Sequence, residues 1–236
     1  MNRSSIEWTD HTWNPVTGCK HGCSYCYARR LAEGRLKGRF GYVHGFEPTF
    51  HVNRLDEPGQ IKKPSKIFVC SMGDLFGEWV PSRWICSVLE VIRANPQHQF
   101  QVLTKNPSRI ARWFNISENI WLGTSIDGLE NSMGRIEIIR KLPQENLKFI
   151  SFEPILADIA NKPEWKIGIN SDGIDWVIVG AQTGPNAKEP RLDWIKNMLF
   201  DCECAGIPFF MKNNVPWNGP RPQEYPISQN KGIDEI

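Results

Sequence analysis

Six short apolar runs constrain the fold of this chain more than any other feature. Each run is rich in β-branched and aromatic residues, lacks polar alternation and ends in small or polar residues. They cover residues 66–70, 100–103, 120–123, 147–150, 176–179 and 207–210, and a weaker run covers residues 6–10. Runs of this kind are typical of strands buried on both faces, as in a parallel sheet.

Helical patterns lie between these runs. Residues 81–94 place Ile85, Val88 and Ile92 on one face, and Pro81 suits a first helical turn. Further helices are predicted over residues 107–114, 129–142 and 192–202. Strand and helix alternate about six times, which predicts an α/β fold with a parallel sheet, built as a partial (βα)6 TIM-like barrel.

The chain shows no sequence repeat and no clean linker, so we predict one domain over residues 1–212. Residues 34–64 are rich in Gly and Pro and are predicted to form an insertion or long loop before the second strand. Residues 213–236 include four prolines and are predicted to form an irregular, Pro-rich C-terminal tail.

Composition excludes several classes of protein. The 236 residues include 28 Lys and Arg and 26 Asp and Glu, a net charge of +2 that excludes a polybasic arm or an acidic tail. The balance of 40% apolar and 23% charged residues excludes a disordered chain. We find no membrane-spanning run and no signal peptide, which predicts a cytoplasmic protein without a membrane partner. The odd count of seven cysteines argues against a disulfide framework.

Three of the seven cysteines crowd together after the first weak strand. Cys19, Cys23 and Cys26 lie in one short loop, and Gly18 and Gly22 allow that loop to turn tightly. Three thiolates can bind three irons of a cubane iron–sulfur cluster and leave the fourth iron without a protein ligand.

Two other interpretations of the cysteines stay open at this point. A zinc site needs a fourth ligand, which His21 or His11 could supply. Cys23 and Cys26 alone could also form a dithiol redox pair.

The spacing of the cysteines carries a family resemblance. The pattern C-x-x-x-C-x-aromatic-C, with Tyr25 as the aromatic residue, resembles the signature of radical S-adenosylmethionine (SAM) enzymes. From residue 6 to about residue 212, the chain resembles a bacteriophage-associated family of radical SAM proteins. The segments that carry this second likeness are residues 6–10, 13–19, 152–154 and 175–180.

The resemblance implies a partial barrel of the radical SAM type, with a 4Fe-4S cluster and SAM as cofactors. In such enzymes one electron from the reduced cluster cleaves SAM to methionine and a 5′-deoxyadenosyl radical, which abstracts hydrogen from a substrate. It also implies an electron donor, such as flavodoxin or ferredoxin, as a partner.

The resemblance implies roles for the first half of the chain. Cys19, Cys23 and Cys26 would bind the cluster, and Tyr25 would pack near it and offer backbone atoms to the adenine. Residues 71–74 would receive the methionine ammonium through backbone carbonyls and an acidic side chain; they are Ser71, Met72, Gly73 and Asp74. This segment departs from the family's Gly-Gly-Glu pattern, and its aspartate is one methylene shorter than glutamate.

Other implied site residues follow later strands, where ligands lie in parallel α/β folds. Ser125 and Asp127 would face the ribose hydroxyls, although Asp127 also begins a common turn pair. Lys105 would pair with the methionine carboxylate or a substrate anion, or else be a solvated loop lysine. Glu153 and Gln182 would meet ribose, adenine or substrate. Because Lys and Glu are poor helix caps, Lys105 and Glu153 are our predicted catalytic side chains.

We expect the substrate to be a nucleoside, nucleotide or nucleic-acid base. The family's phage association and a basic stretch favour this class, since basic residues contact phosphate. The stretch comprises Arg29, Arg30, Arg35, Lys37, Arg39, His44 and His51. A solvated helix face is the plainer interpretation of that stretch. The alternatives for the whole chain are a nucleic-acid lesion repair enzyme of the same superfamily and a zinc-stabilised nucleic-acid-binding module.

Overall fold

The computed structural model describes residues 1–113 and 116–227. The chain divides into two compact units, Met1–Trp121 and Leu122–Ile236, and each is described by itself. Phe114, the end of one predicted helix, and residues 228–236 of the predicted C-terminal tail lie outside the described residues. The prediction of a single domain over residues 1–212 therefore stays a prediction.

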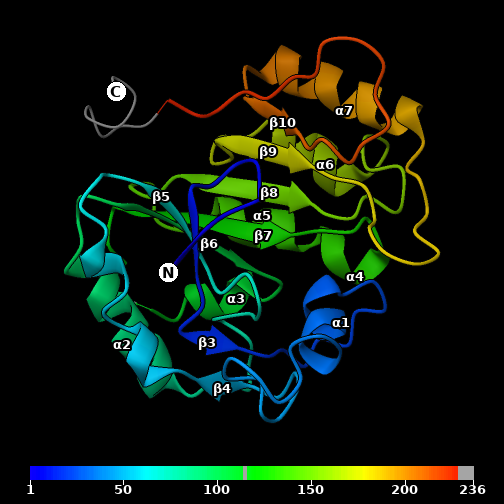
Figure 1. Cartoon of the computed structure of the whole chain (residues 1–236). Coiled ribbons are helices and arrows are strands. Elements are labelled where there is room, and N and C mark those ends of the chain that lie inside the picture. The colour runs from blue at the N-terminus through cyan, green and yellow to red at the C-terminus, as the bar shows by residue number, and fades with distance from the viewer. Residues whose placement is uncertain (114–115, 228–236) are drawn as a thin grey trace. The chain divides into compact units, whose positions relative to one another are not determined.

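The first unit contains a mostly parallel sheet (Figure 1). Its strands are, in spatial order, β1 (Asn2–Arg3), β2 (His11–Trp13), β5 (Lys66–Val69) and β6 (Gln99–Thr104). β1 is antiparallel to β2, whereas β2, β5 and β6 run parallel. The apolar runs predicted as strands at 66–70 and 100–103 are thus confirmed.

The weak strand predicted over residues 6–10 is wrong. These residues form turns and bends, and the strand comes directly after them as β2. The cause lies in two polar side chains: the Thr9 hydroxyl donates to the Lys66 carbonyl at 3.1 Å, and the Asp10 carboxylate accepts from the Lys66 amide at 2.7 Å. Trp13, at the end of β2, supplies the fully buried side chain.

The remaining elements of the first unit surround the predicted insertion. They are β3 (Val16–Thr17), α1 (Tyr27–Glu33), β4 (Thr49–Phe50), η1 (Val52–Arg54), η2 (Pro58–Gln60), α2 (Ser82–Arg93) and α3 (Pro107–Ile110). β3 and β4 pair as a separate two-stranded sheet, and Phe50 stacks on Trp84 of α2 with ring centroids 5.4 Å apart. The helix predicted over 81–94 is confirmed, and the one predicted from residue 107 is shorter than expected.

Residues 34–64 are fastened to the connection between β2 and β3. The Arg54 guanidinium donates to the carbonyls of Asn14 and Phe40 at 2.9 and 2.7 Å. The Trp13 indole donates to the Arg54 carbonyl at 2.7 Å. β4 and two short 3₁₀ helices lie within this predicted insertion or long loop.

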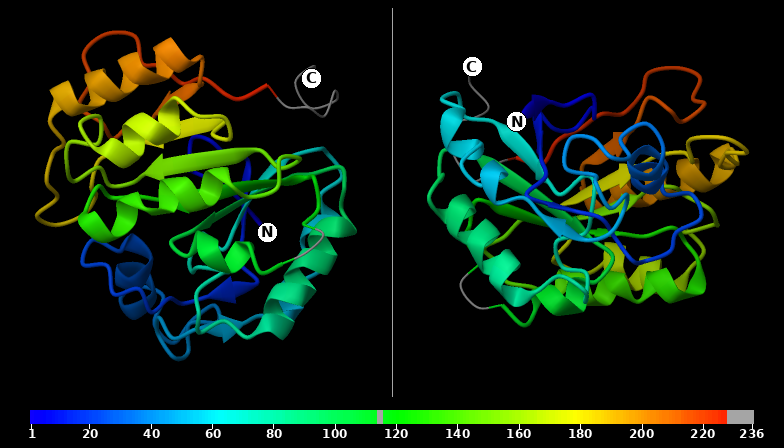
Figure 2. Two further views of the ribbon diagram at one scale, coloured as in Figure 1. Left: turned by 180° about the vertical axis from the view of Figure 1, so that it is seen from behind. Right: turned by 60° about the horizontal axis from the view of Figure 1, so that its bottom comes forward.

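The second unit is a parallel sheet of four strands. They are, in order, β7 (Ile120–Ser125), which begins at the boundary between the units, β8 (Lys148–Phe152), β9 (Trp176–Val179) and β10 (Phe209–Met211). Its helices are α4 (Glu130–Met133), α5 (Arg135–Arg140), α6 (Pro163–Ile169) and α7 (Leu192–Ala205). Seen from behind, α5 and α6 lie on the same face of these strands (Figure 2).

Two helices of the second unit differ from expectation. The helix predicted over 129–142 is broken into α4 and α5 at Gly134. α6 was not predicted, although Pro163 stands in its first turn and Trp165 is buried to 1% exposure. Both units alternate parallel strands with helices, which confirms the α/β class. No helix within residues 1–113 and 116–227 is long and apolar enough to cross a membrane.

A buried histidine sits in the segment 34–64. His51 is 7% exposed, and its Nε2 lies 2.8 Å from the Thr17 hydroxyl. Burial, aided by the nearby Arg54 guanidinium, lowers the pKa of His51 from 6.5 to about 4. The folded chain therefore keeps this ring neutral at pH values where an unfolded histidine is protonated.

We expect acid to destabilise the fold through His51. Between pH 6.5 and 4 the unfolded chain takes up a proton that the folded chain does not, so the free energy of unfolding falls by up to about 3 kcal/mol. Urea unfolding at pH 7, 5.5 and 4.5 measures this slope. His51→Asn should flatten it, leaving the smaller slope from His98, whose pKa burial also lowers. Equal slopes in the variant and the wild type would contradict the assignment.

Candidate functional site

The loop that carries the three cysteines joins β3 to α1 in the first unit. It begins at Gly18, which has a φ of 86°, and a Cβ there would lie 2.4 Å from the Glu47 carbonyl carbon. The Gly18 amide donates to the Met72 carbonyl at 2.9 Å, and Gly18 forms a parallel bridge with Gly73. Only glycine fits this crossing of two backbones.

The three thiols are anchored yet accessible. Cys19, Cys23 and Cys26 are each half-buried, and none forms a disulfide. Cys26 caps α1, because its Sγ accepts from the Arg29 amide at 3.3 Å. Cys19 and Cys26 pack against one small apolar core, made of Ala28, Ala32, Tyr42 and Phe46.

Burial raises the pKa of the Cys19 thiol to about 12, and the charges of Asp74 and the other two thiols act in the same direction. A metal or cluster binds thiolate, so binding at Cys19 must release this proton. The partly apolar surroundings of Cys19 thus favour the neutral thiol over the thiolate.

The metal-binding side chains of the loop are the three cysteines and His21. Across residues 1–113 and 116–227, no three His, Cys, Asp or Glu side chains lie close enough to hold one metal ion. His21, one predicted fourth ligand for zinc, has its Nε2 2.8 Å from Asp74 Oδ2.

Asp74 lies at the centre of the polar contacts around the loop. It is 4% exposed and its carboxylate accepts four hydrogen bonds. Oδ1 accepts from the Phe76 amide at 3.0 Å and from the Thr104 hydroxyl at 2.7 Å. Oδ2 accepts from the Lys105 amide at 2.9 Å and from His21. Sequence reasoning did not identify the contact with His21.

Lys105 also reaches the cysteine loop. Its Nζ donates to the Tyr25 hydroxyl at 2.5 Å and lies 4.9 Å from the centroid of that ring. Lys105 therefore contacts the protein through its ammonium and is not a fully solvated loop lysine. Tyr27, the first residue of α1, donates its hydroxyl to the Ser71 carbonyl at 2.5 Å.

The segment 71–73 is held by Asn14, another residue that sequence reasoning missed. The Asn14 side-chain oxygen accepts from the Met72 amide at 2.9 Å and from the Ser71 hydroxyl at 3.2 Å. With the Gly73 bridge to Gly18, this contact fixes the backbone of the segment that the resemblance assigns to methionine binding.

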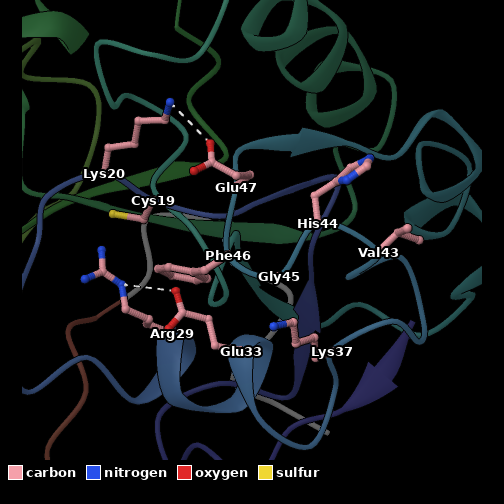
Figure 3. Close-up of a pocket in the computed structure, with 10 residues that line it drawn as sticks. All are labelled: Cys19, Lys20, Arg29, Glu33, Lys37, Val43, His44, Gly45, Phe46 and Glu47. Atoms are coloured by element: carbon pink, nitrogen blue, oxygen red, sulfur yellow. Dashed lines mark ion pairs between the residues drawn. The ribbon is translucent and has the colours of Figure 1, made fainter.

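A cavity of about 720 Å³ opens beside Cys19 (Figure 3). Its walls carry two exposed ion pairs, Lys20 with Glu47 at 3.3 Å and Arg29 with Glu33 at 3.9 Å. The other lining residues include Lys37, His44 and the buried ring of Phe46. The whole cavity is built from residues 19–47.

The second unit holds an ion pair at the carboxyl ends of its strands. Glu153 Oε1 lies 2.6 Å from Lys212 Nζ, and Oε2 accepts from the Ser151 hydroxyl at 2.7 Å. A Cβ on Gly180 would lie 2.8 Å from Glu153 Oε1, so glycine leaves room for the pair. Lys212 follows a strand, as the predicted site residues do, and that signal could have identified it.

The other site residues predicted in the second unit make local contacts. The Ser125 carbonyl accepts from Arg135 Nη1 at 2.7 Å. Asp127 Oδ1 accepts from the Leu129 amide at 3.1 Å, just before α4, which favours the turn interpretation of Asp127. Gln182 Oε1 accepts from the Lys188 amide at 3.3 Å.

A family model described as "Protein of unknown function (DUF5131)" matches residues 3–230. The chain belongs to this family. No curated protein matches its sequence.

The fold resembles solved radical SAM structures. A spore photoproduct lyase complexed with dinucleoside spore photoproduct is 13% identical, with a TM-score of 0.56 over 89% of this chain and 78% of that chain. A radical SAM methyltransferase from Sphaerobacter thermophilus is 16% identical, with a TM-score of 0.53 over 85% of this chain and 65% of that chain. The DUF5131 chain thus has the predicted fold, a partial barrel of the radical SAM type.

Two glycines of the loop offer a matched test of its backbone. Gly18→Ala should lower the free energy of unfolding by about 3 kcal/mol or more, because strain at positive φ adds to a collision with Glu47. Gly22→Ala should cost only about 1–2 kcal/mol, since φ is 74° but no atom lies within 4 Å of the added Cβ. Chemical denaturation compares the two. Equal losses would mean that the close approach at Gly18 is not a constraint.

Proposed function

We propose that this protein is a radical SAM enzyme whose 4Fe-4S cluster is bound by Cys19, Cys23 and Cys26. The observation that carries the proposal is a three-cysteine loop, between a strand and a helix, in a chain with the radical SAM fold. When bound, the reduced cluster would supply the electron that splits SAM and so begins hydrogen abstraction from the substrate. A flavodoxin or ferredoxin is the proposed source of that electron.

The residues around the loop have defined tasks in this proposal. The backbone of Ser71, Met72 and Gly73, fixed by Asn14, offers carbonyl oxygens to the methionine ammonium. The ammonium of Lys105 serves the methionine carboxylate or a substrate anion. The apolar core beneath Cys19 and Cys26 limits the access of water, which protects reactive intermediates.

Further assignments come from the resemblance alone. Tyr25 is proposed to contact the adenine, and Ser125 and Asp127 the ribose hydroxyls. Glu153 and Gln182 are proposed to contact ribose, adenine or substrate. The ion pair with Lys212 would hold the Glu153 carboxylate in place.

The cysteines provide the decisive test. Anaerobically purified or reconstituted wild type should be brown and bind about four irons per chain. Cys19→Ser, Cys23→Ser and Cys26→Ser should each lose the cluster and all 5′-deoxyadenosine formation with dithionite and SAM. Cys86→Ser, at an exposed cysteine of α2, is the matched control and should retain both. A colourless wild type, or a brown one that forms no 5′-deoxyadenosine, would refute the enzyme proposal.

We propose that the substrate is a nucleotide or a nucleic-acid strand. The cavity beside Cys19 supports this class. Residues 19–47 hold six Lys or Arg and two Glu, a net charge of +4 in a chain whose total is +2. The two ion pairs at the cavity are exposed, so an incoming phosphate can exchange with their carboxylates at little cost.

One solved structure with this fold is a spore photoproduct lyase complexed with dinucleoside spore photoproduct. This likeness supports lesion repair as the second candidate reaction for the same site. The bacteriophage association stays a prediction.

A Lys37 variant tests whether the cavity beside Cys19 contacts phosphate groups of the substrate. A fluorescent single-stranded oligonucleotide should bind the wild type with an affinity that falls as salt rises. Lys37→Ala should reduce the slope of log K against log salt by about 0.7. Lys63→Ala removes an equal charge from an exposed position outside the cavity and should leave the slope unchanged. Equal effects of the two variants, or no binding at low salt, would count against the proposed substrate class.

A further inference from the structure

We infer that Asp74 and Lys105 brace the cysteine loop at two points, and that Asp74 is a positioning residue rather than a ligand of the methionine ammonium. The purpose of the brace rests on the proposed function. Its geometry does not, because all of its contacts join residues of this chain to one another.

The acceptor capacity of Asp74 is already used. An ionised carboxylate has about four acceptor positions, and that of Asp74 accepts from Phe76, Thr104, Lys105 and His21. With 4% exposure, the side chain has no open side from which an ammonium could approach. A methionine ammonium would have to displace one of these donors.

The first brace point lies between Cys19 and Cys23. His21 stands between them in the sequence, and its ring is bonded to Asp74. The ring also meets Trp79 edge-on, with centroids 4.8 Å apart and planes at 80°. These two contacts fix both the position and the tilt of the imidazole.

The second brace point lies between Cys23 and Cys26. Tyr25 stands there, and its hydroxyl is bonded to Lys105. The amide of the same lysine is bonded to Asp74, so both points converge on the carboxyl ends of β5 and β6. Each interval between consecutive cysteines is therefore tied to the sheet.

A loop tied in this way is ordered before any cluster arrives. The conformational entropy of the loop is then lost during folding rather than during cluster assembly, which favours binding and slows release. Outer contacts of this kind commonly change metal affinity by about tenfold or more.

Hydrogen exchange of the cluster-free protein tests the brace directly. His21→Leu should speed amide exchange of residues 19–27 by about tenfold, and His21→Gln, which keeps a donor of similar reach, should largely restore protection. Asn119→Ala is the control: it removes bonds to three carbonyls elsewhere in the first unit and should leave exchange of the loop unchanged. Unchanged exchange in His21→Leu, or equal acceleration in Asn119→Ala, would overturn the inference.

Reconstituted protein supplies the second measurement. We expect release of iron to a chelator to be about tenfold faster in His21→Leu and in Asp74→Asn than in the wild type. The SAM affinity of the cluster-loaded fraction of Asp74→Asn should change less than threefold. Loss of SAM binding from an intact cluster in Asp74→Asn would restore the ammonium role and overturn ours.

The outcomes separate the two proposals. If the wild type binds no iron but the exchange pattern holds, the enzyme proposal fails and the brace stands. If iron and SAM bind normally but His21→Leu leaves the loop protected, the brace fails and the enzyme proposal stands.

Discussion

The close crossing of two backbones at Gly18 and Gly73 is the constraint on which the site depends. Gly18 needs a positive φ and has no room for a side chain beside Glu47. Gly73 is similarly crowded, because a Cβ there would lie 3.1 Å from the Gly18 carbonyl oxygen. The bridge between them brings the start of the cysteine loop to the end of β5. The contacts of His21 and Tyr25 with the ends of β5 and β6 require this approach.

Sequence patterns predicted the elements whose structure depends on burial. The runs that form β5 to β10 are apolar because both faces of these strands are covered. Such a run can be recognised from a few consecutive residues. The wrong and missed elements are those whose structure depends on specific long-range contacts. Residues 6–10 are only a weak run with two apolar residues, and Thr9 and Asp10 bond to Lys66. α6 is short, and its burial of Trp165 depends on packing that no local pattern reveals.

In the candidate site, too, the local features could be predicted from the sequence and the long-range contacts could not. The cysteine spacing is local, so the sequence could predict the loop and its place between a strand and a helix. The contacts that tie the loop to the sheet could not be predicted, because their partners are distant in the sequence. His21 lies 53 residues from Asp74, and Tyr25 lies 80 residues from Lys105. Rules based on strand ends located Asp74 and Lys105, yet they could not tell whether each side chain faces a ligand or another part of the protein.

The contacts of Asp74 explain how an aspartate can stand where the Gly-Gly-Glu pattern of radical SAM enzymes has a glutamate. An acidic side chain one methylene shorter reaches less far from β5, and the structure shows what lies within that reach: a hydroxyl, two backbone amides and an imidazole. Four donors satisfy one buried carboxylate, which removes the cost of burying its charge. The short side chain of Asp74 thus joins the loop to the ends of two strands. Under the proposed function, recognition of the methionine ammonium would then fall to the backbone of residues 71–73, which Asn14 and Gly18 hold in place.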